Sequence, residues 1–126
     1  MDRLEDVEKA IRTFLIGEGF GNVCLGGMSE DVDDAAIFVQ IRGGGSTGTF
    51  SGVMHDPNVQ IIVRTAPHQQ AEGVQRTDDI YHALTHSEPG GDVAVYSTAP
   101  RTPLGPDDDD RYRFTINFPV QTLVFV

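Results

Sequence analysis

The first stretch of the chain carries apolar residues at steps of three and four, which places them on one face of a helix. These residues are Leu4, Val7, Ile11, Phe14 and Leu15. Gly17 and Gly19 come directly after them, and glycine commonly ends a helix. The pattern therefore predicts an amphipathic helix that ends at about residue 17.

Three segments between residues 22 and 65 have the composition of β-strands. Ala35–Arg42 is β-branched and aromatic with nearly continuous apolar character, which is typical of a strand buried on both faces. Asn58–Thr65 alternates, with valine and isoleucine at every second position on one face. The shorter run Asn22–Leu25 is followed by two glycines, which stop it. We expect two long central strands and one short strand.

A second helix is predicted between the central strands and the C-terminal third of the chain. Pro67 suits the first position of a helix, because that position has no hydrogen-bonded N–H to lose. Apolar residues at helical spacing then continue to about His86. The sequence Pro89-Gly90-Gly91 ends the pattern.

The remaining third of the chain alternates in two places. Asp92–Thr98 has the period of a strand, and Arg111–Val126 alternates aromatic and polar residues. Pro119 interrupts this last strand, which is therefore expected to bend there or to lie at a sheet edge. Between them, the prolines and glycine of Pro100–Pro106 predict a rigid, irregular connection.

The glycine-rich run Gly43–Gly48 follows a predicted strand and invites comparison with a phosphate-binding loop. It contains no lysine, does not match the P-loop spacing and precedes Thr-Phe-Ser-Gly instead of a helix. Because glycine loses the most backbone entropy on ordering, we expect a flexible connection that reaches about Asp56-Pro57 and orders on a partner.

These elements follow one another in the order α-β-β-β-α-β-β. Runs of strands separated by single helices indicate an α+β fold, with a mostly antiparallel sheet and both helices packed on one face. The length of 126 residues suits one domain, and neither a repeat nor a shift in composition marks a second. We therefore expect a single domain over residues 1–126.

Charge is the strongest compositional feature. Nineteen acidic residues against nine lysines and arginines give a formal net charge of −10. This charge argues against an autonomous nucleic-acid binder, but not against a ring that DNA passes without binding. Eight of the acids lie in Glu30–Asp34 and Asp107–Asp110, so much of the charge is expected in loops.

The single cysteine, Cys24, excludes an intramolecular disulfide and a zinc site made of thiolates. It lies in a short apolar run, where a buried and inert thiol is expected. The N-terminus is charged and lacks the apolar core of a secretory signal, so we expect synthesis in the cytoplasm.

A row of potential metal ligands lies at helical spacing in the second helix. Asp78, His82 and His86 are four residues apart, and such a row presents a carboxylate and two imidazoles on one stripe. The apolar stripe of the same helix runs through other positions, so a solvated face is the favoured interpretation. Asp107, Asp108, Asp109 and Asp110 lack the spacing of a calcium loop and predict a solvated hairpin turn.

No serine, threonine or cysteine lies in a recognisable nucleophile motif, and the four histidines are scattered. We therefore expect no catalytic residues, no cofactor and no metal. A small metal-dependent enzyme that uses Asp78, His82 and His86 remains the minor alternative.

Basic residues are unusual in kind, with eight arginines and one lysine, Lys9. Arginine is enriched at protein interfaces, where its planar guanidinium pairs with carboxylates through two hydrogen bonds. We expect repeated copies of the chain to pair arginines with a neighbour's acidic loop. The candidate interface residues are Arg42, Gly43, Gly44, Gly45, Arg64, Asp107, Asp108, Asp109, Asp110, Arg111 and Arg113.

The order and spacing of several short motifs resemble a known family over about residues 4 to 122. After an N-terminal helix, the motifs are Ile41-Arg42-Gly43-Gly44; Pro57, Gln60 and Arg64; Ala71, Ile80, Tyr81, Ala83 and Leu84; Pro100 to Leu104 with an acidic turn; and Arg111, Tyr112, Phe114, Asn117 and Phe118. In this order they resemble the tail terminator (minor capsid or tail-completion) proteins of long-tailed bacteriophages and related tail-like particles. The Gly43–Gly52 stretch departs from the family pattern.

The resemblance implies a structural role in the virion. Such proteins form a ring, expected to be hexameric, that caps the tail tube, stops its polymerisation and meets the head-completion connector. It implies assembly in the cytoplasm of the bacterial host, at the head–tail junction of the particle, with DNA passing through the ring and no contact with a membrane. A different head–tail connector or neck ring protein is the alternative within the same class.

Overall fold

The computed structural model describes residues 4–28, 32–48, 52–85, 87–90, 93–95, 102–120 and 122–125. Its helices are α1 (Leu4–Gly17) and α2 (Gln70–Leu84). Its strands are β1 (Val23–Leu25), β2 (Ala36–Gly48), β3 (Gly52–Pro67), β4 (Ser87–Gly90), β5 (Val93–Val95), β6 (Thr102–Pro106), β7 (Arg111–Pro119) and β8 (Thr122–Phe125). The expected helix at the N-terminus and the two central strands are confirmed.

Long antiparallel strands build most of the main sheet, whose order is β1-β2-β3-β7-β6, with β8 also paired to β3. The short strand β1 is the exception, because it runs parallel to β2. Residues Ile37, Val63 and Phe114 lie side by side on neighbouring strands and mark one row of the face that the helices cover. A separate two-stranded sheet joins β4 to β5.

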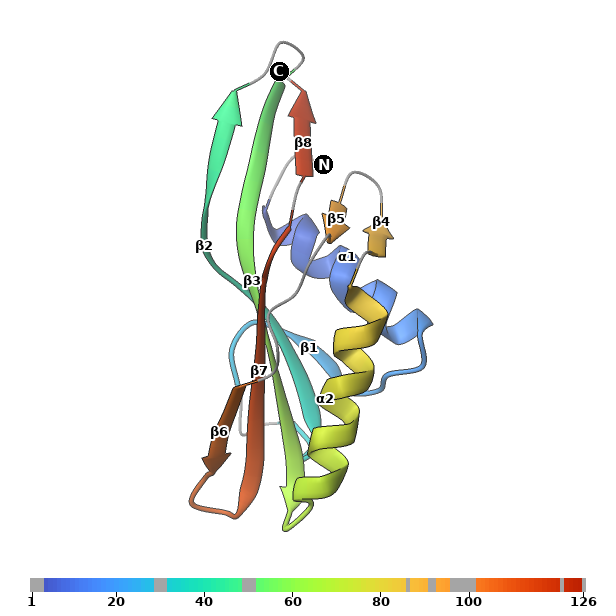
Figure 1. Cartoon of the computed structure of the whole chain (residues 1–126), viewed down its shortest axis with the longest axis vertical. Helices are drawn as coiled ribbons and strands as arrows, with labels where there is room; N and C mark the ends of the chain where they lie inside the picture. The colour runs from blue at the N-terminus through green and yellow to red at the C-terminus, as the bar shows by residue number, and fades with distance from the viewer. Residues whose placement is uncertain are drawn as a thin grey trace.

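Both helices pack on the same face of the sheet, which confirms the α+β arrangement expected from the sequence (Figure 1). Val7, Ile11 and Leu15 of α1 are fully buried. They share one core with Ile80 and Leu84 of α2 and with the alternating valines and isoleucines of β2 and β3. Among the described helices, none combines the length and apolar character needed to cross a bilayer.

The opposite face of the sheet carries a second, smaller apolar cluster. Ala36, Phe38 and Ile62 are buried there, and Cys24 and Val32 pack against them. The thiol of Cys24 is half-buried, so it is less enclosed than the sequence suggested. No helix contributes to this cluster within the described residues, and Val32 brings the acidic loop before β2 onto it.

The glycine run is not a flexible connection, and that expectation was wrong. β2 continues through it to Gly48, and residues from Gly44 onward pair with β3 back to Val53. A backbone N–H and C=O can form a ladder without side chains, so the continuous partner strand β3 overrides the poor strand propensity of glycine. A three-stranded arm is formed by residues 44–48, 52–57 and 122–125. Its tip lies beyond both helices (Figure 1).

The strand pairing of the arm and that of the helix-covered part of the sheet meet at one residue of β3, Asn58. On one side, Ile41 pairs with Val59 but Gly44 pairs with Pro57, so a bulge of β2 lies opposite Asn58. On the other side, β7 ends at Pro119, also opposite Asn58, and β8 resumes the pairing further along. Pro119 thus divides the last predicted strand in two.

Three further boundaries differ from the predicted ones. Pro67 ends β3 instead of opening the helix, because it still pairs with Arg111; the chain turns at His68, whose φ is 62°, before α2 begins. Pro103 lies in a strand, β6, where an irregular connection was expected. Pro89 and Gly90 were expected only to end the helical pattern, but they belong to a strand, β4 (Ser87–Gly90). In each case pairing with a neighbouring strand outweighs the local signal.

Candidate functional site

A buried arginine at the start of β7 lies at the centre of a cluster of charged side chains. The side chain of Arg111 is only 6% exposed and contacts three carboxylates. Its Nε donates to Asp107 Oδ2 at 2.8 Å, its Nη1 to Asp34 Oδ1 at 3.1 Å, and its Nη2 lies 3.4 Å from Asp109 Oδ2. We call these four residues the Arg111 cluster. It joins the acidic loop before β2 to the turn between β6 and β7.

The turn itself is built around Asp107, and the predicted hairpin over Asp107–Asp110 is confirmed. Asp107 Oδ1 accepts hydrogen bonds from the backbone N–H of Asp109 at 2.9 Å and of Arg111 at 3.0 Å. Desolvation acts to raise the pKa of Asp107, but these two bonds and the Arg111 guanidinium outweigh it, so the pKa is lowered from its ordinary value. Asp107 is therefore held ionised as part of the fold.

Arg64 lies on β3 with its side chain on the face away from the helices, and it is 1% exposed. Its Nε donates to the carbonyl oxygen of Asp34 at 2.9 Å and its Nη2 to that of Asp33 at 3.0 Å. The guanidinium carbon lies 5.1 Å from the centre of the Phe38 ring, within the range of a cation–π contact. Arg64 thus ties the acidic loop down over the smaller apolar cluster.

Between these groups lies an open polar cleft. Its lining residues are Met28, Arg64, Asp107, Asp108, Asp109, Arg111 and Arg113. Side chains of both charge signs line it, so it is suited to ionic contact.

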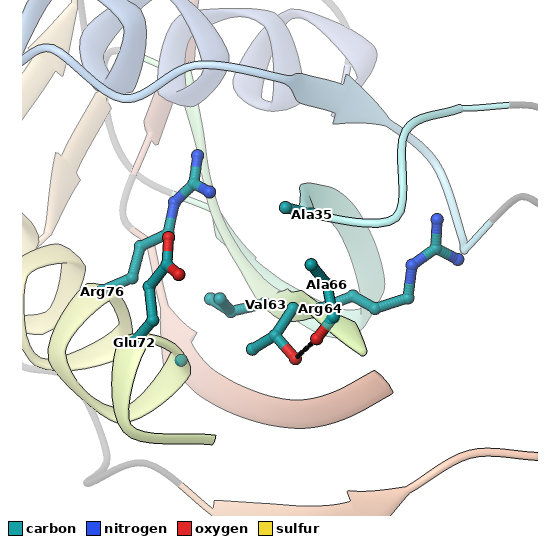
Figure 2. A pocket seen from close by; sticks show the side chains of 8 residues that line it. Ala35, Val63, Arg64, Ala66, Glu72 and Arg76 are labelled. Carbon is teal, nitrogen blue, oxygen red and sulfur yellow. Dashed lines mark hydrogen bonds between the residues drawn. The ribbon is translucent and has the colours of Figure 1, made fainter. Parts of the chain in front are cut away.

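A second, narrower hollow separates α2 from the end of β3, and Figure 2 shows its lining. Glu72 and Arg76 reach toward it from the helix, whereas Arg64 extends away from them to the far side of the strand. Arg76 Nη2 donates to the carbonyl oxygen of Gly21 at 2.7 Å, so this arginine ties α2 to the loop before β1. The contact is structural.

The structure brings together some of the predicted interface residues and separates others. The predicted residues that gather at the cleft are Arg64, Asp107, Asp108, Asp109, Arg111 and Arg113. Asp108 and Asp110 are exposed on the same turn, and Asp110 also lies 3.8 Å from His68. The backbone of Arg42, Gly43, Gly44 and Gly45 continues β2 toward the arm, and the Arg42 side chain lies outside the described residues.

Two of the predicted arginines have partners inside their own chain. Arg64 and Arg111 were expected to pair with a neighbour's acidic loop, yet both side chains are buried and hold acidic segments of the same chain. Asp34 was absent from the candidate list. It lies 77 positions from Arg111 in the sequence, and no local pattern marks that contact.

The predicted row of metal ligands can be followed in part. Asp78 is half-buried, His82 is exposed on α2, and its ring lies edge-on against Tyr81, with the centroids 5.4 Å apart. His86 lies outside the described residues. Within the described part of the chain, no three histidine, cysteine, aspartate or glutamate side chains are grouped so as to hold a metal ion.

A family model described as bacteriophage tail terminator protein matches residues 14–124. The chain belongs to the bacteriophage tail terminator family. Membership makes it a structural protein of the phage tail and a component of the virion, as the sequence motifs indicated. Proteins of this family are typically non-enzymatic.

A solved structure supports the same fold. A chain from the virion of a native gene transfer agent (GTA) particle superposes with a TM-score of 0.70 at 11% sequence identity, over 94% of this chain and 95% of that chain. At this identity the likeness establishes the fold alone. No curated protein sequence matches the tail terminator chain at a significant level.

Proposed function

We propose that copies of this chain form a ring that caps the phage tail tube, ends its polymerisation and joins the tail to the head-completion connector. The match to the tail terminator family over residues 14–124 is the observation that carries the proposal. The expected ring is hexameric, and it assembles in the cytoplasm of the bacterial host before it becomes part of the head–tail junction. The chain would act without a cofactor, metal or membrane.

The charge of the chain supports passage of DNA through such a ring. A formal net charge of −10 repels phosphate, so the protomer disfavours tight contact with a translocating duplex. Cyclic rings also need two different surfaces that complement each other, because each protomer meets its neighbours head to tail. A mixed-charge cleft on one side and a protruding arm on the other would offer two such surfaces.

We infer that the interface includes Arg42, the backbone of Gly43, Gly44 and Gly45, and the exposed turn residues Asp108 and Asp110. Because Arg64 and Arg111 are buried, their part in this interface is to hold the turn and the acidic loop in position. Arg113 is half-buried, and its Nε lies 3.5 Å from the carbonyl oxygen of Gly105, so it stands at the rim.

Electron microscopy of particles made without this protein is the decisive test of the function. Overlong or headless tails are expected, because the tube would lack the cap that stops its growth. Normal tails beside empty or tail-less heads would instead identify the protein as a connector on the head side. Mass measurement of the purified chain should give a monomer or a hexamer, with ring assembly favoured on tail tubes.

The interface can be tested by a charge reversal with a matched control. Asp108→Lys alters the exposed acidic turn, whereas Glu18→Lys makes the same change in charge at an exposed position after α1. We expect Asp108→Lys to weaken ring assembly on tail tubes several-fold and Glu18→Lys to leave it unchanged. Equal effects of the two variants would mean that net charge matters and the turn does not.

A further inference from the structure

The acidic loop before β2 is held in an unusual way. Residues 32–35 lie against the smaller apolar cluster, because Val32 packs on it together with Cys24. Among the described residues, the hydrogen bonds that hold this segment come from side chains: Arg64 donates to two of its carbonyl oxygens, Arg111 to the Asp34 carboxylate, and Asn22 Nδ2 to the Ala35 carbonyl at 3.2 Å. A backbone ladder begins only at Ala36.

The two arginines that hold this segment differ in what they lose when it lifts. Arg111 keeps Asp107 and Asp109, both from its own hairpin, so it remains ion-paired without Asp34. Arg64 lines the polar cleft, where water can replace the two carbonyl oxygens. Breaking a buried ion pair is costly when one charge is left buried without a partner. Neither guanidinium is left in that state when the segment lifts.

The Asp34 contact is the weaker tie. Its side chain is 53% exposed, so solvent screens its attraction to Arg111. The sheet beneath is held differently, because β2, β3 and β7 pair continuously along the row of Phe38, Ile62 and Thr115. The segment can therefore lift while the ladder under it stays closed.

We propose that residues 32–35 form an arginine-latched strap that opens separately from the folded sheet and controls access to the apolar cluster of Ala36, Phe38 and Ile62. Opening exposes this cluster on the face that carries no helix, and closing covers it again. The strap rests on contacts within one chain and is independent of the proposed function.

The single cysteine gives a direct readout. Cys24 packs on the same cluster as Val32, and its Sγ lies 3.8 Å from the carbonyl oxygen of Asn22. Its reaction with an excess of an aromatic disulfide reagent, followed on the full-length chain, reports how often the cluster opens. Because the thiol is only half-buried when the strap is closed, the closed form contributes a constant background rate. When opening and closing are fast relative to reaction, the rate above this background is proportional to the population of the open form.

Asp34→Asn removes the charge of the latch and keeps the size of the side chain. We expect it to raise the rate of Cys24 labelling about three- to fivefold, as for a partly exposed ion pair. Glu18→Gln makes the same change in net charge on an exposed side chain away from the cleft and should leave the rate unchanged. Salt screens the attraction between Asp34 and Arg111, so about 1 M KCl should raise the rate of Cys24 labelling in the wild type. The increase should be smaller in Asp34→Asn, which lacks this ion pair.

The dependence on urea separates strap opening from global unfolding. A local opening exposes little surface, so the labelling rate should rise only weakly with urea below the unfolding transition. Three outcomes would overturn the proposal: equal rates for Asp34→Asn and Glu18→Gln, a urea slope equal to that of global unfolding, or labelling of the wild type as fast as that of a free thiol.

Discussion

Gly73 of α2 packs directly against the sheet, and Gly73→Ala should destabilise the protein. A Cβ added there meets Thr65 Cγ2 in a severe overlap and lies 2.7 Å from Cε2 of Phe114. Neither neighbour can move easily. Phe114 is 3% exposed, and the Thr65 hydroxyl is fixed because it donates to the Ala66 carbonyl at 2.7 Å and accepts from the Tyr112 N–H at 3.0 Å.

The expected magnitude follows from two opposed effects. Alanine in place of glycine inside a helix stabilises it by about 1 kcal/mol. Inserting a methyl group into a packed core costs about 1–3 kcal/mol, and the fixed neighbours of Gly73 favour the upper end of that range. The net loss should be about 2 kcal/mol in the free energy of unfolding, or roughly 8 °C in Tm for a domain of this size.

Urea unfolding followed by circular dichroism measures this loss, and Gly17→Ala is the matched control. Gly17 is the last residue of α1, and no atom lies within 4 Å of the Cβ that alanine would add. That variant should keep or slightly raise the wild-type stability. Thr65→Ser removes the overlapping methyl group and should restore part of the stability when combined with Gly73→Ala. Wild-type stability in Gly73→Ala alone would refute the close packing of α2 on the sheet.

Three further outcomes follow from the charged contacts. Folding lowers the pKa of Asp107, so the ionised carboxylate stabilises the protein above the unfolded-state pKa. This stabilisation is lost as pH falls through the folded-state pKa. In a plot of the urea midpoint against pH, Asp107→Asn should therefore show a smaller decrease on the acid side than the wild type. Arg111→Ala should cost about 2–3 kcal/mol in urea unfolding, less than for a fully buried pair because two of its carboxylate partners are largely exposed; an unchanged midpoint would contradict its role in the cluster. Arg76→Ala removes the bond to the Gly21 carbonyl and should cost about 1 kcal/mol, read as a shift in thermal midpoint. Purified protein should carry no stoichiometric zinc by elemental analysis, and zinc that is lost on His82→Ala would contradict the structural role.

Hydrophobic periodicity predicted the elements whose positions depend on burial. Ile11 and Leu15 in α1, and Ile61 and Val63 in β3, lie where a helical or alternating pattern directs them, because each contributes a side chain to the core. The placement of both helices on one face follows from the same pattern.

Elements that depend on partner strands could not be predicted this way. Gly44 and Gly45 carry no side chain to mark a face, and their strand exists because β3 runs beside them. Pro67 has the residue type of a helix start, but its neighbour on β7 keeps it in the sheet.

The candidate site shows the same limit. Counts of arginine and acid pointed to Arg111 and Asp107 as candidate interface residues. Only the fold revealed that Asp34, far away in the sequence, completes their contacts. The burial of Arg64 was equally hidden, because a strand pattern does not say which polar position will be covered by a distant loop.

β3 also has a mechanical consequence. Its 16 residues span roughly 50 Å in extended form, from the tip of the arm to the start of the turn before α2. At Asn58 a bulge distorts β2 and β7 ends, so of these three strands β3 alone passes that level with neither a bulge nor an end. A ribbon bends most easily where fewest strands are continuous. A load on the tip would therefore swing the arm as a lever about Asn58, and the helix-covered part of the sheet would keep its shape.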